Sequence, residues 1–264
     1  MENIITSKEN PVIRLYQKLS SSKKERLQYG LFVLEGLRII KDAVSENAGI
    51  THLLVTEKAC QKFRADFFQA DLRNTKIIVI SNELGNRISS TDKTQGIFAV
   101  CSVPTGTGIK FRENGRYIVL HGIQDPGIAV MIIRTADALG IDGIIMSGSC
   151  ELYSPKVVRA TMGSVFRVNI IIENDIDSVF RMLETNSVMT SAAVIDSDAE
   201  NIMQCVFSGA QAVFIGNEGN GLPRDVAARC SRRVTIPMKG SVNSLNAAMA
   251  AGILMWEMER DNGR

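Results

Sequence analysis

The chain has 264 residues, of which 45% are hydrophobic and 22% are charged, and its formal net charge is +2. This length allows two domains with sizeable cores, and the composition excludes disordered, collagen-like and low-complexity proteins. The longest apolar run, residues 247–256, is too short to cross a bilayer, and the N-terminal residues lack the apolar core of a secretion signal, so we expect a cytoplasmic protein with no membrane contact.

The five cysteines and two histidines do not form a metal-binding pattern. The cysteines are odd in number and widely spaced, and no Cys-x-x-Cys pair occurs, which argues against a disulfide framework and against a zinc site. We therefore expect no metal. A catalytic pair of one cysteine and one histidine stays open, although lone cysteines are mostly small buried apolar residues.

The positive charge is concentrated at the beginning of the chain. Residues 1–104 carry 15 Lys and Arg against 11 Asp and Glu, whereas the remainder carries 15 against 17. Within residues 8–41, eight basic residues face three acidic ones. A basic region of this kind fits the binding of a polyanion, and on charge alone it fits a solvated helix face equally well.

The first part of the chain alternates short aliphatic runs with helical patterns, which predicts parallel strands covered by helices. Expected strands are 31–36, 51–57, 76–81 and 96–103. The following segment, 103–116, is rich in Gly, Thr and charge and has no periodicity, as is typical of a linker. We therefore expect a first domain over residues 1–108 and a second over residues 109–264.

The second part repeats the pattern and predicts an α/β fold with a mainly parallel sheet. Several of its apolar runs are continuous, as expected for strands covered on both faces. The expected strands are 117–123, 143–148, 167–172, 188–195, 211–216 and 232–237. In such sheets the ligand binds beyond the carboxyl ends of the strands, so function is to be sought in the loops that follow them.

Three of these loops stand out because each runs from a strand end through a turn into a helix. They are 124–140, 217–223 and 238–252. Each presents backbone N–H groups and small residues to the same edge of the sheet. Neither G-x-G-x-x-G nor a P-loop motif occurs in the chain, so a nicotinamide site and a nucleotide P-loop have no support.

Polar residues in these loops go beyond simple turn formation. Glu218 is a lone carboxylate in a glycine-rich turn. Ser244 or Asn243 can cap the helix that follows, and Asn246 adds a second polar group beside Ser244. Arg134 lies in an apolar run that we expect to be buried, where an arginine needs an anionic partner or a ligand.

Four segments of the second part resemble the SpoU (TrmH-type) RNA ribose 2′-O-methyltransferases of the SPOUT superfamily. They read DPGIAVMIIRTADALG, SPKVVRATMGSVFRV, IGNEGNGLP and IPMKGSVNSLNAAMAAG, and in the first part NPVIRLYQKL and GLFVLEGLRIIKDAV resemble the family's substrate-binding domain. The resemblance implies a small L30e-like α/β RNA-binding domain. It also implies a methyltransferase domain that is tied in a deep trefoil knot.

The resemblance further implies S-adenosylmethionine as cofactor and a homodimer formed through the methyltransferase domain. By carry-over, the cofactor site is lined by Ile215, Gly216, Asn217, Glu218, Gly219, Ile236, Met238, Ser244 and Leu245. The expected catalytic residues are Arg134, Glu218, Ser244 and Asn246. RNA phosphates are expected at Lys156, Arg159 and Arg167, and the favoured substrate is 23S rRNA.

One motif departs from the family pattern. The family's first motif reads Asn-x-Gly-x-Ile-x-Arg, and here Ile128 stands for the Asn and Val130 for the Gly. We expect an active enzyme whose substrate-side pocket differs from the usual one. Three alternatives stay open: a tRNA methyltransferase, an rRNA methyltransferase that confers antibiotic resistance, and a catalytically weakened RNA-binding homologue.

Overall fold

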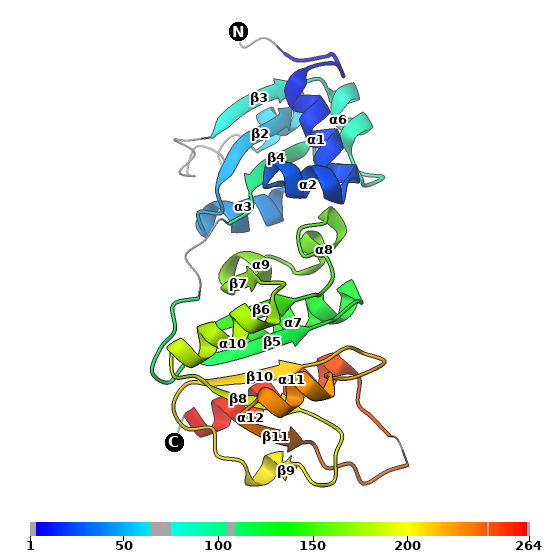
Figure 1. Cartoon of the computed structure of the whole chain (residues 1–264). Helices are drawn as coiled ribbons and strands as arrows, with labels where there is room; N and C mark the ends of the chain where they lie inside the picture. Colours follow the sequence, from blue (N-terminus) through cyan, green and yellow to red (C-terminus); the bar gives the residue numbers. More distant parts are fainter. Residues whose placement is uncertain (1–3, 64–74, 105–108, 242, 263–264) are drawn as a thin grey trace. The chain divides into compact units, whose positions relative to one another are not determined.

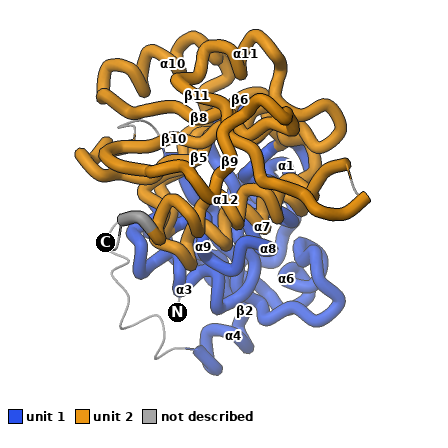
Figure 2. The backbone as a smooth tube through the Cα atoms, turned by 90° about the horizontal axis from the view of Figure 1, so that it is seen from below, with its two compact units in different colours: residues 1–106, 151–166 blue, residues 107–150, 167–264 orange. Residues whose placement is uncertain are grey.

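The chain folds into two compact units, each of which combines two separate stretches of the sequence. A computed structural model describes residues 4–63, 75–104, 109–241 and 243–262. The first unit consists of residues 1–106 and 151–166, and the second consists of residues 107–150 and 167–264 (Figure 2). The predicted boundary at residue 108 lies outside the described residues. Residues 151–166 thus pack with the first unit although they lie within the second half of the sequence.

The first unit is built on a sheet that, in the described part of the chain, has four strands in the order β1-β4-β2-β3 (Figure 1). They are β1 (Leu31–Glu35), β2 (Ile50–Thr56), β3 (Lys76–Ile80) and β4 (Ile97–Ser102). All four predicted strands are confirmed, but the expected parallel direction is wrong for β4. That strand runs antiparallel to both β1 and β2. Apolar periodicity shows which residues are buried but carries no information on strand direction.

The helices that cover this sheet begin with an amphipathic one. They are α1 (Pro11–Ser21), α2 (Lys23–Tyr29), α3 (Leu37–Ser45), α4 (Glu57–Lys62) and α6 (Asn82–Ile88). Ile13, Tyr16 and Leu19 lie one helical turn apart, so α1 buries them together in the core. Basic residues of α1 and α2 are exposed on the opposite side: Arg14, Lys18, Lys23 and Lys24. Arg26 of α2 is the exception, because it is buried.

Residues 151–166 complete the first unit. They contain α8 (Pro155–Ala160) and most of α9 (Ser164–Arg167). Ser154 caps α8 by accepting a hydrogen bond from the Val157 amide at 3.4 Å, and Pro155 occupies the first helical position, as is favoured there. The predicted strand over 167–172 therefore begins later, because Arg167 is still helical.

The second unit contains a parallel sheet that, within the described residues, has seven strands in the order β7-β6-β5-β10-β8-β11-β9. They are β5 (Arg116–His121), β6 (Gly143–Ser147), β7 (Ile170–Ile172), β8 (Met189–Ala193), β9 (Glu200–Asn201), β10 (Gln211–Ile215) and β11 (Arg232–Thr235). The six predicted strands and their parallel direction are confirmed. The two-residue strand β9 was not predicted, because so short a strand has no periodicity. The trefoil knot stays a prediction.

Helices cover both faces of this sheet, as the continuously apolar strands predicted. They are α7 (Pro126–Leu139), α10 (Ile176–Thr185), α11 (Arg224–Arg229) and α12 (Ala247–Asn262), together with a short 3-10 helix, η1 (Ile202–Gln204). Figure 2 shows α10 and α11 on one side of the sheet and α7 and α12 on the other. No helix among the described residues is long and apolar enough to span a membrane.

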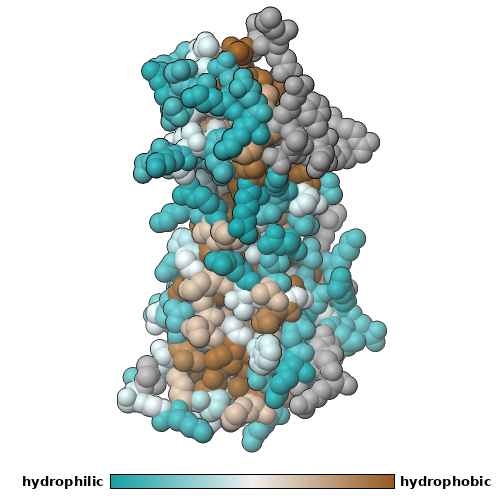
Figure 3. Space-filling model, turned by 180° about the vertical axis from the view of Figure 1, so that it is seen from behind, coloured by the Kyte–Doolittle hydropathy of each residue, from teal (hydrophilic) through white to brown (hydrophobic). Residues whose placement is uncertain are grey.

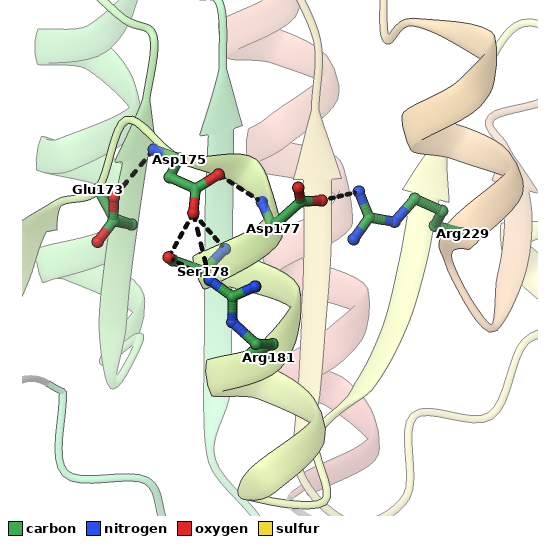
Figure 4. Close-up of polar contacts among 6 residues, drawn as sticks. All are labelled: Glu173, Asp175, Asp177, Ser178, Arg181 and Arg229. Carbon is green, nitrogen blue, oxygen red and sulfur yellow. Dashed lines mark hydrogen bonds and ion pairs between the residues drawn. The ribbon is translucent and has the colours of Figure 1, made fainter.

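Exposed polar contacts join α10 to α11 (Figure 4). The Asp175 carboxylate caps α10 by accepting from the Asp177 and Ser178 amides, each at 3.2 Å, and it pairs with Arg181 at 3.3 Å. Asp177 in turn forms a 2.7 Å ion pair with Arg229 of α11. A side-chain cap of this kind satisfies free amides of the first helical turn, whereas exposed ion pairs contribute little. The network therefore stabilises mainly the start of α10.

Candidate functional site

Three loops meet at one edge of the parallel sheet because β5, β10 and β11 all point the same way. The first loop, residues 122–125, leads into α7. The second, residues 216–223, leads into α11, and the third, residues 236–246, leads into α12. This is the arrangement that the strand and helix patterns predicted.

A cavity of about 920 Å³ lies between the second and third loops. All nine residues predicted for a cofactor site line it: Ile215, Gly216, Asn217, Glu218, Gly219, Ile236, Met238, Ser244 and Leu245. The cavity also takes in residues that the sequence did not single out, among them Ile195 and Asp196 after β8 and Arg233 on β11. Finding these would have required the order of strands in the sheet, which places β8 between β10 and β11.

The second loop folds back tightly on Gly216. Asn217 and Gly221 exchange backbone hydrogen bonds of 3.0 and 2.9 Å, and Asn217 Oδ1 accepts from the Gly219 and Asn220 amides. A Cβ atom at Gly216 would lie 2.1 Å from the Leu222 nitrogen, which is closer than van der Waals contact permits. This wall of the cavity therefore requires a glycine at position 216 and is formed largely by main chain.

Glu218 joins the second loop to the first. Its carboxylate accepts hydrogen bonds from the backbone amides of Gln124, at 3.1 Å, and Asp125, at 2.9 Å. Asn217 Nδ2 adds a 2.9 Å hydrogen bond to the Gly122 carbonyl. Asp125 then caps α7 by accepting from the Gly127 amide at 2.7 Å. A residue that lines the cavity thus also holds the beginning of α7.

Arg134 lies two turns into α7, and the prediction that it is buried is wrong. Its neighbours Ile132, Ile133 and Ala136 are fully buried, but the helical rotation places the arginine on the exposed side. Within the described residues its guanidinium has no hydrogen bond or ion pair. It is therefore available to an anion, although it is not one of the residues that line the cavity.

The third loop shows a different helix start from the predicted one. The helix α12 begins at Ala247, and Asn246 caps it: the Oδ1 atom accepts from the Ala248 amide at 2.9 Å. The expected caps, Ser244 and Asn243, are therefore wrong, because the helix begins at Ala247 and both residues lie too far before it. Ser244 is exposed and free of the capping role, and it lines the cavity beside Leu245.

Two family models match the chain. Residues 115–256 match the SpoU rRNA Methylase family, and residues 10–99 match the MRM3-like substrate binding domain. The first match alone covers more than half of the sequence. The chain belongs to the SpoU rRNA Methylase family.

Several relatives resemble the chain over nearly its whole length. A 23S rRNA (guanosine(2553)-2'-O)-methyltransferase of Bacillus subtilis, RlmP, is 26% identical, and the match covers 96% of this chain and 98% of the relative. The SpoU methyltransferase AviRb of Streptomyces viridochromogenes, in complex with AdoMet, superimposes with a TM-score of 0.85 at 26% identity, over 96% and 98% of the two chains. An AdoMet-bound rRNA methyltransferase of Sinorhizobium meliloti superimposes with a TM-score of 0.84 at 28% identity. The match covers 98% of this chain and 97% of that one.

The two departures from the SpoU pattern lie inside the packed face of α7. Ile128 and Val130 are only 6% and 7% exposed. Both side chains are packed within the unit, and the expectation that the substrate-side pocket differs from the usual one stays a prediction. Their apolar character suits these buried positions, where an unpaired Asn amide is costly.

The structure divides the three cationic residues predicted to bind RNA between the two units of this SpoU chain. Lys156 and Arg159 lie exposed on α8 in the first unit, where Arg159 donates a 3.3 Å hydrogen bond to Ser90 Oγ. Arg167 belongs to the second unit and forms a two-point ion pair with Asp137 of α7, at 2.8 and 3.0 Å. The RNA contacts of all three residues stay predictions.

Cysteine chemistry has little support in this SpoU chain. Burial raises the pKa of the Cys101 thiol, and it raises the pKa of Cys230 to about 12. A reactive cysteine needs a lowered pKa, since the thiolate is the nucleophile. Within the described residues, no three His, Cys, Asp or Glu side chains gather where they could hold a metal ion.

Proposed function

We propose that this protein is an S-adenosylmethionine-dependent RNA 2′-O-ribose methyltransferase that acts on 23S rRNA in the cytoplasm. The observation that carries the proposal is the cavity at the sheet edge, which the nine residues expected to bind the cofactor line together. Its volume of about 920 Å³ falls within the range of ligand pockets, about 300–1,000 Å³. Family membership and the relatives named above point to the same reaction.

The residues around the cavity suit a ligand with both apolar and polar parts. Ile215, Ile236, Met238 and Leu245 supply apolar side chains for a flat base, while the tight turn at Gly216 presents main-chain groups at close range. When bound, S-adenosylmethionine supplies an electrophilic sulfonium methyl group. The protein's task is then to bring a ribose 2′-hydroxyl into line with it.

Positioning is the main contribution of these residues to the reaction. Holding two reacting groups in attack geometry supplies up to about 7–11 kcal/mol. Glu218 serves this purpose by tying the cavity wall to the loop before α7. Ser244 and Asn246 contribute from the third loop, Ser244 at the cavity and Asn246 at the start of α12.

Arg134 stabilises negative charge in this mechanism. A guanidinium is always protonated in proteins, so it cannot remove the proton from the 2′-hydroxyl. Its exposed position on α7, where no residue that the structure describes pairs with it, suits a role at the developing alkoxide and the adjacent phosphate.

The first unit binds the RNA substrate. Exposed basic residues on α1 and α2, together with Lys156 and Arg159 on α8, present positive charge for phosphates. Structured RNA is recognised mainly by shape and by 2′-hydroxyl and phosphate contacts, with a loop nucleotide splayed out for reaction. The match of residues 10–99 to a substrate binding domain supports this division of tasks.

The helices α7 and α12 supply the surface for a homodimer. They pack on each other and leave Met131, Met249 and Trp256 exposed by 49%, 62% and 59%. Figure 3 shows apolar side chains gathered on this side of the second unit. Trp256→Lys should convert the dimer to a monomer in light scattering, and a wild-type protein that is already monomeric would contradict the homodimer.

Methyl transfer tests the proposed function directly. Labelled S-adenosylmethionine is incubated with the protein and with rRNA and tRNA fractions from a strain that lacks it, and the label is mapped to a ribose. Label in 23S rRNA supports the proposal. Label in tRNA would show that tRNA, and not 23S rRNA, is the substrate. If the protein binds the cofactor but labels no fraction, a non-catalytic RNA-binding homologue is favoured. Drug susceptibility of the two strains tests for antibiotic resistance.

A further inference from the structure

Residues 151–166, hereafter the inserted segment, are held by the first unit through a compact apolar contact. Leu152, Val157 and Val158 are between 1% and 3% exposed. Phe32 of β1 packs against the rings of Tyr153 and Phe166, with centroid distances of 4.8 and 6.4 Å. Residues from the second half of the chain thus become part of the unit that carries the substrate-binding domain.

A buried ion pair joins the start of the inserted segment to α2. Arg26 Nε and Nη2 donate to the two carboxylate oxygens of Glu151 at 2.6 and 2.9 Å, and Arg26 Nη1 donates to the Leu19 carbonyl. The two side chains are 7% and 20% exposed. Such a two-point contact fixes the orientation of both partners as well as their distance.

The residues on either side of the inserted segment belong to the second unit and are held within it. At the upstream end, the Cys150 amide donates to the Ile123 carbonyl at 2.7 Å, and Ser149 Oγ donates to the Leu120 carbonyl at 3.0 Å. At the downstream end, Arg167 forms its ion pair with Asp137. Asp137 lies on α7 three residues after Arg134.

We propose that Arg26 and Glu151 are a positioning pair for RNA binding and methyl transfer, because they fix the segment that carries Lys156 and Arg159 within the first unit. The pair makes Lys156 and Arg159 part of the first unit's RNA surface. This inference rests on the proposed function, and neither Arg26 nor Glu151 touches the cofactor cavity.

Breaking the pair at one partner is more disruptive than replacing both. Arg26→Met leaves the Glu151 carboxylate half-buried without its cation, whereas Arg26→Met with Glu151→Met substitutes an apolar pair of similar length. A buried ion pair replaced by well-packed apolar residues often keeps or gains stability, whereas the loss of one partner leaves a buried charge uncompensated. The double variant therefore separates loss of the contact from loss of the charge.

Salt-dependent RNA binding measures the effect of the Arg26–Glu151 pair on RNA affinity and does not require catalysis. The full-length protein is titrated with an in vitro transcript of 23S rRNA at several salt concentrations. Arg26→Met should raise the Kd about tenfold and reduce the slope of log K against log salt by about 1.4, the amount expected for two lost phosphate contacts to single-stranded RNA. The double variant Lys156→Ala with Arg159→Ala should show the same reduced slope. Adding Arg26→Met to this double variant should not reduce the slope further.

Methyl transfer then separates positioning from binding. At saturating RNA, Arg26→Met should also lower the single-turnover rate, while the Kd for S-adenosylmethionine stays unchanged. The apolar double variant should recover RNA affinity and rate. Arg181→Met breaks the exposed pair with Asp175 (Figure 4) and serves as the control that changes neither.

Three results would overturn the inference. The first is a slope of log K against log salt that is unchanged in Arg26→Met. The second is a further reduction of that slope when Arg26→Met is combined with Lys156→Ala and Arg159→Ala. The third is a normal single-turnover rate in an Arg26→Met protein whose residues 151–166 are unprotected in hydrogen exchange. If Arg26→Met does not fold, the apolar double variant decides, and it overturns the inference if it folds but does not bind RNA like the wild type. A wild-type protein that binds RNA with the expected slopes but transfers no methyl group refutes the proposed function alone.

Discussion

The cofactor side and the RNA side of the candidate site are built in different ways. On the cofactor side, nine residues from the end of β10 and the two loops come together around one cavity. On the RNA side, four cationic residues are spread over two units: Lys156 and Arg159 lie in the first unit, and Arg134 and Arg167 lie in the second.

This difference follows from what each side must contact. A small ligand can be held by main chain and short side chains, so its site is confined to turns whose sequence is local. An RNA strand presents phosphates over a long distance, and long cationic side chains on separate elements can reach them. Local motifs therefore predict the first kind of site well and the second kind poorly.

The largest expected effect tests the cofactor side. Gly216→Ala should weaken S-adenosylmethionine binding at least about a hundredfold, or about 2.8 kcal/mol, because its Cβ would lie 2.1 Å from the Leu222 nitrogen and displace the loop. Calorimetry measures the change. Gly240→Ala is the matched control, since nothing lies within 4 Å of its Cβ position. Normal affinity in Gly216→Ala would contradict the assignment of the cavity.

Arg134→Ala tests the RNA side of the reaction. The single-turnover rate should fall about 10²–10³-fold, the typical loss for a removed charge-stabilising donor, while cofactor affinity stays unchanged. Exposure of the side chain makes a folding defect unexpected. Equal losses of rate and cofactor affinity would instead mean that Arg134 maintains the cavity.

The double change Ile128→Asn with Val130→Gly restores the family's first motif and tests whether the two residues matter for packing or for catalysis. Since both side chains are buried, we expect a loss of about 2–4 kcal/mol in unfolding free energy, through lost apolar packing and a Gly within α7. Denaturant unfolding measures it, with Ile128→Leu as a control expected to cost less than about 1.5 kcal/mol. Restored methylation in an otherwise inactive protein would instead favour the non-catalytic homologue.

The smallest expected effect concerns Glu35, which accepts a hydrogen bond from Ser90, the residue that Arg159 contacts. Burial raises the pKa of Glu35, but hydrogen bonds from Ser89, Ser90 and Thr91 outweigh it and leave the pKa below its ordinary value of 4.5. An ionised Glu35 therefore stabilises the folded state above that pH, and the contribution is lost as the pH falls through the folded-state pKa.

Glu35→Gln measures this contribution. The variant should be less stable than the wild type at pH 7, and the difference should shrink below about pH 4.5. Glu83→Gln removes an exposed carboxylate of the same unit and is the control. A difference that persists unchanged at acid pH would show that the carboxylate charge is not what stabilises the loop around Ser90.

The sequence alone was sufficient for ten of the strands and for nine of the residues that line the cavity. Ten predicted strands are present, and residues 216–223 and 236–246 enclose the predicted cavity. Both results depend on local information. Apolar periodicity marks buried strands, and Gly216 is required by atoms only five and six residues away.

Only the tertiary structure decided the direction of β4, the exposure of Arg134, the capping role of Asn246 and the place of residues 151–166. Arg26 and Glu151 are 125 residues apart in sequence, and neither residue's neighbours indicate the other. Such contacts depend on which distant segments meet when the first unit forms. A local pattern shows that a side chain needs a partner, but the packing of distant segments determines which partner it finds.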